Sequence, residues 1–258
     1  MPGTRLRAAL PAVLTALAAS LPAAAGTEAH ARAASPPAPG AWRLVFDDEF
    51  DGTALDLRKW SPYDSPGNDG HGLRRPSAFA LDGEGHLVVT AQMVDGTLVS
   101  GGMASTYNRT YGYFEVRVRT DPDPTGTVSG VVLTWPQSGN WPQDGENDVY
   151  ETQDGGGHYQ FRTFVHYGAD NRQYDFTHRA DGAEWHTVGL EWQPRRLTLY
   201  RDGSRVWTLT NADAVPRVPH HVCVQLDATS DGPLAGPVRM YVDYVRVWRR
   251  VPASAGRG

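Results

Sequence analysis

Three carboxylates fall close together in one segment of the chain. Glu146, Asp148 and Glu151 lie in the run Trp141–Glu151, which reads WPQDGENDVYE. Residues two apart share a face of a β-strand, so Glu146 and Asp148 would project together. Glu151 is five residues from Glu146 and would point to the other face of a regular strand, but one β-bulge restores its parity. We therefore expect a bulged strand that brings all three carboxylates to one surface.

Paired carboxyls on one surface are the groups that hydrolyse glycosidic bonds. One must be ionised and the other protonated, about 5–5.5 Å apart in retaining enzymes and about 6.5–9.5 Å apart in inverting ones. On a bulged strand the Cα atoms of Glu146 and Glu151 would lie about 13 Å apart or less, and inward-leaning side chains could close most of that gap. Asp148, between them, can orient the first glutamate. Close carboxylates also repel, so one of them keeps its proton to higher pH.

Acidic residues that alternate along a strand more often form a solvated face, and this alternative has to be weighed. Two features favour a site. Trp135 and Trp141 flank the acidic cluster, and the next expected strand brings His166 to the same face as Arg162. Three acids on one face without basic partners would destabilise a strand that had only a structural role.

The elements that must position these residues are short strands. Segments of five to ten residues alternate apolar and polar side chains, and turn sequences such as Asp82–Gly85, Asp95-Gly96 and Asp202-Gly203 separate them. The expected strands are 42–46, 86–92, 111–120, 127–135, 160–167, 185–192, 222–227 and 238–248, with a hairpin of 197–200 and 205–209. This pattern predicts an all-β fold, an antiparallel β-sandwich with one polar, functional sheet face.

The N-terminal sequence predicts where the protein acts and how the chain is divided into parts. A basic start, an apolar run broken by Pro11 and Pro22, and alanines at positions 29, 31 and 33 are typical of a cleaved export signal rather than of a membrane anchor. We therefore expect a secreted, extracellular protein with no membrane contact after cleavage. The predicted parts are a signal peptide over 1–33, a linker over 34–40, one domain over 41–250 and a tail over 251–258.

Charge and cysteine content exclude some partners. The net charge of −5 argues against nucleic acid, and the arginine pairs Arg74-Arg75 and Arg195-Arg196 are expected on the solvated surface. Cys223 is the only cysteine, so an internal disulfide is impossible, and its apolar surroundings place it in the core. Eight Trp and eleven Tyr suit a protein that stacks sugar rings. We expect a monomer that binds a polysaccharide.

The chain resembles a known family. The motif Glu146-x-Asp148-x-x-Glu151, preceded by Trp-Pro and a Gly, is similar to the active-site signature of glycoside hydrolase family 16, in the bulged form that laminarinases carry. Other segments similar to that family lie in the same order along nearly the whole expected domain: FDDEFDG at 46–52, YGYFEVR at 111–117, HTVGLEW at 186–192 and VDYVRV at 242–247.

The resemblance implies a jelly-roll sandwich with a concave cleft and a retaining mechanism. Glu146 would be the nucleophile, Asp148 would orient it, and Glu151 would be the acid and base. The residues implied to line the cleft are Trp135, Trp141, Glu115, Arg117, His166, Trp192 and Gln225. No cofactor is needed for catalysis, but the family often binds one structural calcium, here with Glu49 and Asp243 as side-chain ligands.

The resemblance also implies a substrate and marks one departure. It points to internal cleavage of β-1,3-glucan or of mixed β-1,3/1,4-glucan. A galactanase on the same scaffold is one alternative, and a lectin that binds sugar without cutting it is another, because fold does not fix function. Asn147 stands where the family usually has an apolar residue, and an unpaired amide buried between the sheets would cost about 1–3 kcal/mol.

Overall fold

The computed structural model describes residues 36–152 and 159–252. Within these ranges the segments in which polar and apolar side chains alternate form β-strands almost throughout. The expected export signal over 1–33, the first two linker residues and residues 253–258 of the tail lie outside the described residues. No helix in the described ranges is long and apolar enough to cross a membrane. The elements within them are β1 (Trp42–Asp48), β2 (Trp60–Pro62), β3 (Ser65–Pro66), η1 (Asn68–Gly70), β4 (Leu73–Arg74), η2 (Pro76–Ala78), β5 (Phe79–Leu81), β6 (Leu87–Val94), β7 (Thr97–Ser105), β8 (Gly112–Thr120), β9 (Val128–Pro136), β10 (Glu146–Glu151), β11 (Phe161–Tyr167), β12 (Arg172–His178), β13 (His186–Gln193), β14 (Arg196–Arg201), β15 (Ser204–Leu209), β16 (His220–Ala228) and β17 (Val238–Arg250).

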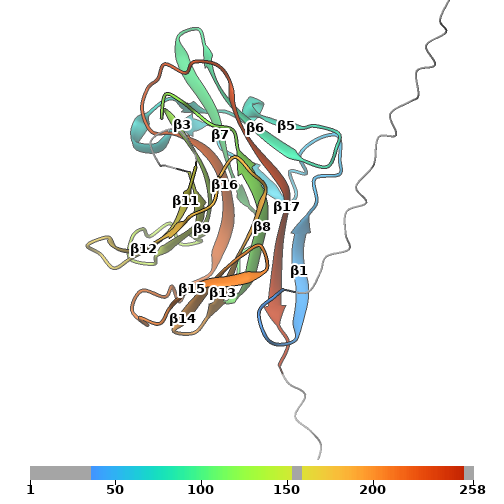
Figure 1. Ribbon diagram of the computed structural model, residues 1–258, viewed down its shortest axis with the longest axis vertical. Coiled ribbons are helices and arrows are strands. Elements are labelled where there is room, and N and C mark those ends of the chain that lie inside the picture. Colours follow the sequence, from blue (N-terminus) through green and yellow to red (C-terminus); the bar gives the residue numbers. More distant parts are fainter. Residues whose placement is uncertain (1–35, 153–158, 253–258) are drawn as a thin grey trace, which may run out of the picture. The chain divides into compact units, whose positions relative to one another are not determined.

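The strands form two stacked layers, as Figure 1 shows. The layer that we call the cleft sheet has the order β12–β11–β10–β9–β16–β7–β2. The layer that we call the outer sheet runs β15–β14–β13–β8–β17, and the far edge of β17 pairs first with β6 and then with β1. These pairings are antiparallel, which confirms the predicted all-β sandwich.

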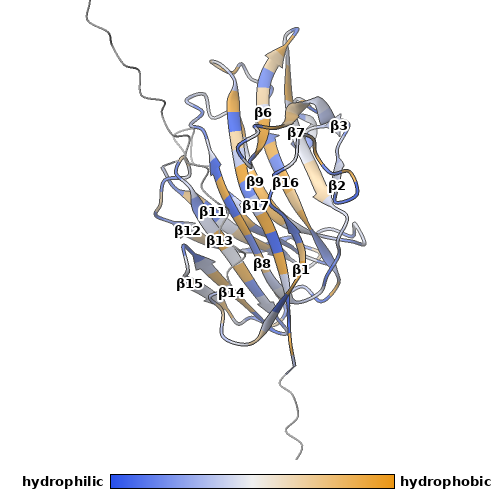
Figure 2. Cartoon of the chain, turned by 90° about the vertical axis from the view of Figure 1, so that its right-hand side faces the viewer, coloured by the Kyte–Doolittle hydropathy of each residue, from blue (hydrophilic) through white to orange (hydrophobic). Residues whose placement is uncertain are grey.

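The core lies between the two layers and follows from strand alternation. Phe114, Val116 and Val118 of β8 point inward, where they belong to one apolar cluster with Val132 of β9 and Val224 of β16. Figure 2 shows the alternation as bands of hydrophobic and hydrophilic colour along β8 and β17. Each such side chain contributes about 1.5–3 kcal/mol when it leaves water. Both sheets therefore keep their apolar faces inward and present polar faces to solvent on opposite sides of the domain.

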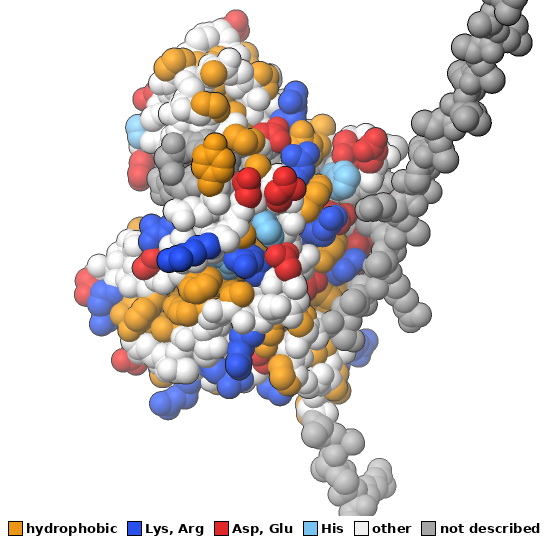
Figure 3. Space-filling model, viewed as in Figure 1, with side chains coloured by type: hydrophobic (Ala, Val, Ile, Leu, Met, Phe, Trp, Pro, Cys, Tyr) orange, Lys and Arg blue, Asp and Glu red, His pale blue; other side chains and the backbone are white. Residues whose placement is uncertain are grey.

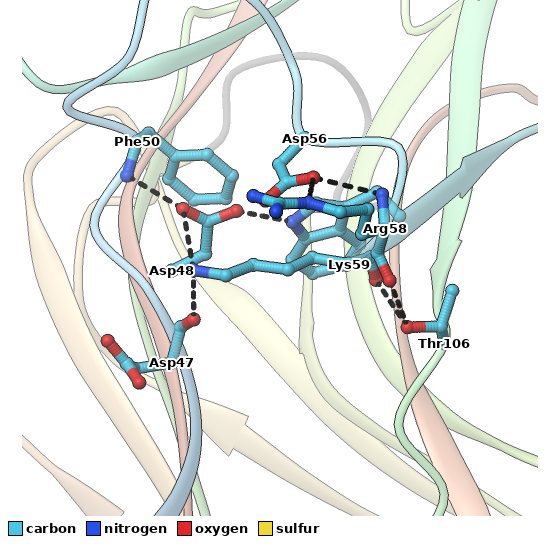
Figure 4. Close-up of polar contacts among 8 residues, drawn as sticks. Asp47, Asp48, Phe50, Asp56, Arg58, Lys59 and Thr106 are labelled. Atoms are coloured by element: carbon cyan, nitrogen blue, oxygen red, sulfur yellow. Dashed lines mark hydrogen bonds and ion pairs between the residues drawn. The ribbon is translucent and has the colours of Figure 1, made fainter.

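A polar cluster around Asp48 fixes the loop between β1 and β2 (Figure 4). The Asp48 carboxylate accepts hydrogen bonds from Trp60 Nε1 at 2.7 Å and from the Phe50 amide at 3.2 Å. Lys59 lies 3.6 Å from the same carboxylate and donates to the Asp47 carbonyl at 2.7 Å. The cluster sets where β2 begins, and β2 leads directly to Tyr63 at the wall of the cleft.

The expected turns and all the expected strands are present. Asp95-Gly96 and Asp202-Gly203 both have positive φ at both positions, 49° and 81° in the first and 49° and 77° in the second. This is the conformation of a tight hairpin turn that favours Asp-Gly. The sequence did not predict β7, whose alternation is interrupted by Gly101 and Gly102.

Candidate active site

The bulge in β10 is present and lies between Asp148 and Glu151. Asp148 pairs with Phe164 and Glu151 with Arg162, so β10 advances three residues while β11 advances two. The extra residue turns Val149 and Tyr150 inward together, with 5% and 0% exposure. The Tyr150 hydroxyl donates to the Gly182 carbonyl at 2.8 Å. The core therefore holds the bulge, and Glu151 returns to the face of Glu146 and Asp148.

That face is the wall of a cleft of about 920 Å³ on the polar side of the cleft sheet. Its floor is a small apolar patch of Val131, Leu133 and Cys223, so Cys223 is buried, but toward the cleft rather than in the main core. The side chains with chemistry that line it are Glu146, Asp148, Glu151, His166, Trp135, Trp141, Gln225, Tyr63, Arg74 and Asp227. The cleft thus brings the three carboxylates together with aromatic and hydrogen-bonding groups.

Burial controls the protonation of the three carboxyls. Glu146 and Asp148 are only 7% and 4% exposed. Burial, and then the charge of Asp148, raise the pKa of Glu146 to about 9. Burial, and then the charge of Glu151, raise the pKa of Asp148 well above its ordinary value. Burial also raises the pKa of Glu151, against the opposing effect of His166. Burial and mutual repulsion therefore disfavour the charged forms of all three groups and oppose their ionising together.

Tryptophan anchors the first glutamate. Trp141 Nε1 donates to Glu146 Oε2 at 2.6 Å, and the Trp141 ring stacks on Trp135 with centroids 6.1 Å apart and an interplanar angle of 13°. The turn between Trp141 and Glu146 needs Gly145, whose φ is +82° and where a Cβ atom would lie 2.8 Å from Pro216. The turn thereby fixes the positions of both the Trp141 N–H and the Glu146 carboxylate that accepts its hydrogen bond. Trp141 still keeps 40% of its surface exposed, on the side of the cleft.

The unusual Asn147 has a buried partner behind the strand. Its side-chain nitrogen donates to Thr134 Oγ1 at 2.8 Å, and that oxygen lies 3.1 Å from His220 Nδ1. His220 Nε2 lies 3.1 Å from the carbonyl of Asp144, in the turn before the nucleophile candidate. Burial lowers the pKa of His220 to about 4, so the ring is neutral and can donate from Nε2 while accepting at Nδ1. This series of hydrogen bonds joins β10, β9 and β16 to the turn. The side-chain oxygen Oδ1 of Asn147 has no hydrogen-bond partner.

His166 faces the acidic cluster from β11. It pairs directly with Glu146 across the strands, and its Nε2 lies 3.3 Å from Asp148 Oδ2. Its Nδ1 lies 2.9 Å from Asn171 Oδ1 and 3.1 Å from Gln173 Nε2, which orient the ring. A histidine in this place can stabilise negative charge on the carboxylates beside it.

The family model for glycosyl hydrolases family 16 matches residues 75–246. The chain belongs to this family. It is 28% identical over 81% of its length to a beta-glucanase from Rhodothermus marinus, covering 86% of that protein. It is 31% identical over 63% of its length to a glucan endo-1,3-beta-glucosidase from Cryptopygus antarcticus, covering 67% of that protein. The laminarinase structure from Rhodothermus marinus superposes with a TM-score of 0.71 at 25% identity, over 82% of this chain and 98% of the other. The protein is thus a glycoside hydrolase with the jelly-roll fold of laminarinases.

Three residues that the resemblance to family 16 implied for the cleft lie elsewhere. Trp192 is fully buried between the sheets and donates its Nε1 hydrogen to the Pro216 carbonyl at 3.1 Å. Glu115 and Arg117 belong to β8 of the outer sheet. Arg117 pairs there with Asp243 and lies over the Trp185 ring. The prediction was wrong for Glu115 and Arg117 because both sheets show the same alternation, and the sequence does not tell which polar face is hollowed. It was wrong for Trp192 because that ring packs in the core instead of facing solvent.

The carboxylates proposed for a calcium ion are paired with arginines. Glu49 accepts two hydrogen bonds from Arg246, at 2.7 and 2.6 Å, and Asp243 accepts one from Arg117 at 2.5 Å. Calcium needs six to eight oxygen ligands with little positive charge nearby. As placed, Glu49 and Asp243 do not fit that ion, because guanidinium groups already neutralise both.

The cleft also contains residues that the sequence did not single out. Asp227 pairs with Arg74 through Nε at 2.8 Å and Nη2 at 2.6 Å, so Arg74 is not the solvated surface residue predicted. Tyr63 donates to Cys223 Sγ at 3.3 Å. A Cβ atom at Gly102 would lie 2.7 Å from the Tyr63 ring and 3.2 Å from Arg74. The parity of Asp227 with Cys223 and Gln225 was the available signal, whereas nothing local placed Arg74 or Tyr63 over β7.

Proposed function

We propose that this family 16 enzyme cuts internal bonds of β-1,3-glucan, or of mixed β-1,3/1,4-glucan, by a retaining double displacement. The observation that carries the proposal is the bulged strand, which turns Glu146, Asp148 and Glu151 into one open cleft beside two stacked tryptophans. The names of the similar proteins, a beta-glucanase, a glucan endo-1,3-beta-glucosidase and a laminarinase, support the substrate class.

In the first step the Glu146 carboxylate attacks the anomeric carbon and forms a glycosyl ester. Glu151 gives its proton to the glycosidic oxygen as the bond to the leaving sugar breaks. In the second step the Glu151 carboxylate takes a proton from water, the water oxygen bonds to the anomeric carbon, and the ester bond to Glu146 breaks. Two inversions give net retention of the β configuration.

The environment of each carboxyl suits its role. Glu146 and Asp148 interact directly, and the proton of the pair is favoured on Glu146, whose pKa the neighbouring Asp148 helps to raise. Attack then begins when this proton moves to Asp148 and leaves the Glu146 carboxylate ionised. The Trp141 N–H stabilises the same carboxylate. Glu151 has a pKa raised by burial, so it keeps a proton to donate. Asp148 thus acts by orienting and polarising the nucleophile.

The open cleft and the export pattern carry the remaining parts of the proposal. The cleft is open to solvent, and an open cleft lets a polymer bind at an internal bond, which suits endo action. The basic and apolar start of the chain suits secretion before the enzyme meets an extracellular glucan. Charges of both signs are mixed over the face in Figure 3, with no single-sign field that would favour nucleic acid. We propose a secreted monomer.

A substrate panel with product sizing tests the proposal. Purified protein is incubated with laminarin, lichenan, agarose and carrageenan, and reducing ends and product lengths are followed with time. We expect laminarin, with or without lichenan, to give a ladder of oligosaccharides before glucose, and proton NMR to show the β anomer first. Cleavage of a galactan alone, or binding of glucan without new reducing ends, would refute the proposed substrate or the proposed activity.

A further inference from the structure

We propose that Glu146, Asp148 and His166 also form a binding site for a divalent transition-metal ion such as Zn²⁺, and that the bound ion blocks hydrolysis by occupying the nucleophile. The blocking part of this inference rests on the proposed function, whereas the binding part does not.

The first support is the geometry of the donor atoms. One carboxylate oxygen of Glu146, one of Asp148 and one ring nitrogen of His166 all lie within 4.8 Å of one another. Zn²⁺ binds nitrogen and carboxylate oxygen at about 2.0–2.2 Å, so small rotations of these side chains bring three ligands onto one ion. The cleft leaves a fourth position open to water, as in sites with three protein ligands.

The second support is an orphaned atom inside the cluster. Asp148 is 4% exposed, and its Oδ2 has no hydrogen-bond partner. A buried carboxylate oxygen without a donor is unusual in folded proteins. This oxygen faces His166 Nε2 at 3.3 Å, and a cation between the two atoms would satisfy both.

The third support is the orientation of the histidine. His166 Nδ1 lies 2.9 Å from Asn171 Oδ1, which accepts, and 3.1 Å from Gln173 Nε2, which donates. In the tautomer that donates the Nδ1 hydrogen to Asn171, the lone pair of Nε2 is directed at the acidic cluster. Histidines that bind metals usually donate their other ring N–H in this way. An imidazole with two carboxylates favours Zn²⁺, Cu²⁺ or Ni²⁺. It offers too few oxygens for Ca²⁺, which takes six to eight.

A second cluster provides an internal control. Asp82, Glu84 and His86 also lie within ligand distance of one another, but this cluster is at the β5–β6 turn of the outer sheet. Its Asp82 carboxylate already accepts hydrogen bonds from the Glu84 and His86 amides at 2.8 and 3.0 Å. Metal binding there would leave the cleft unobstructed.

The experiment measures Zn²⁺ binding by calorimetry and Zn²⁺ inhibition of laminarin cleavage, for the unsubstituted protein and for the His166→Asn, His166→Gln and His86→Asn variants. Rates are normalised to each variant without metal, and circular dichroism checks that each variant is folded. We expect one Zn²⁺ bound at the cleft, inhibition competitive with substrate, and affinity about tenfold or more weaker in both His166 variants. His86→Asn should leave cleft binding and inhibition unchanged, and Mg²⁺ should not inhibit.

The outcomes separate this inference from the proposed function. Zn²⁺ binding that needs His166 in a protein without hydrolytic activity would refute the function and leave the site. Inhibition that both His166 variants retain, or that only His86→Asn removes, would overturn the inference. So would the absence of any Zn²⁺ binding at millimolar concentration.

Discussion

The polar faces of both sheets carry acidic residues, but the side chains that lie beside those acids differ between the two sheets. On the outer sheet acids stand beside arginines: Glu49 with Arg246, Asp243 with Arg117 and Asp121 with Arg119. On the cleft sheet Glu146, Asp148 and Glu151 stand together, and within residues 36–152 and 159–252 none of them forms an ion pair with arginine or lysine. Arg162, which pairs in register with Glu151, instead binds Asp175.

The difference supports the proposal that the carboxylates of the cleft sheet carry out the chemistry. In the acid–arginine pairs of the outer sheet the guanidinium charge favours the ionised form of the carboxylate beside it. Buried acids that share a site raise each other's pKa and cost stability. Three buried acids on one strand therefore lower stability but can provide reactivity. A glycosidase needs one carboxyl group that keeps its proton and a neighbouring carboxyl group that loses its own.

The largest expected effect comes from removing one carboxylate on each face. Glu146→Gln should lower kcat on laminarin by a factor of about 10⁴ or more, because no ester can form. Glu49→Gln should leave kcat nearly unchanged, because Glu49 lies on the opposite side of the domain. Initial rates and thermal unfolding of both variants check this. Equal losses of activity from the two substitutions would break the comparison.

Two tryptophans sharpen the same contrast. Trp192→Ala should destabilise the fold by about 3–5 kcal/mol, because the ring is fully buried between the sheets. Trp141→Ala should change the unfolding midpoint little, since 40% of its surface is exposed, yet lower kcat/KM by a factor of about 10–100 as stacking and the bond to Glu146 are lost. Denaturant unfolding and steady-state kinetics distinguish the two; the reverse assignment would refute the cleft.

The pH dependence of stability gives a smaller effect. The raised pKa of Glu146, about 9, means that the folded state holds a proton that the unfolded state releases above about 4.5. This stabilisation is present below that pH and is lost as pH rises toward 9. Gln does not titrate, so the stability of Glu146→Gln relative to the unsubstituted protein should increase steadily between pH 5 and pH 9.

Asp82 of the outer sheet is the matched control for that titration. Burial opposes the shift, but hydrogen bonds from Glu84 and His86 lower the pKa of Asp82. Its stabilising contribution is present above the unfolded pKa and is lost as pH falls through the folded one. Asp82→Asn should therefore destabilise the protein at neutral pH and not at strongly acidic pH. Thermal midpoints across pH that show the same trend for both variants would contradict the account.

The smallest effect is expected behind the nucleophile. Asn147→Leu removes the hydrogen bond to Thr134, which costs stability, and also removes the buried, unpaired side-chain oxygen Oδ1, which gains stability. The two contributions partly cancel and leave a change of about 1 kcal/mol or less in the free energy of unfolding. If the Asn147–Thr134–His220 chain positions the turn before Glu146, kcat should fall a few-fold with KM unchanged. A change in KM alone would show that these three hydrogen-bonded side chains do not position Glu146.

Strand alternation predicted the sandwich, the hairpin turns and the bulge, because these depend on neighbouring residues. Alternation also placed His166 on the same face as Arg162, and the resemblance to family 16 placed His166 and Gln225 in the cleft, where both lie. The resemblance failed for Glu115 and Arg117, since both sheets have a polar face and only the pairing of β8 with β13 and β17 shows which one is outside. Arg74 was missed because its pairing with Asp227 joins residues 153 positions apart.

In the proposed mechanism one bulged strand carries both a nucleophile and a separate acid and base. Azide rescue tests it most directly, with an aryl β-glycoside of a β-1,3-linked oligosaccharide as substrate. With Glu146→Ala, azide should attack the anomeric carbon in place of the missing carboxylate and give the α-glycosyl azide. With Glu151→Ala, the activated aryl group leaves without acid help, and azide should displace the Glu146 ester to give the β-glycosyl azide. The same anomer from both variants, or the two anomers exchanged, would contradict the assignment of Glu146 and Glu151.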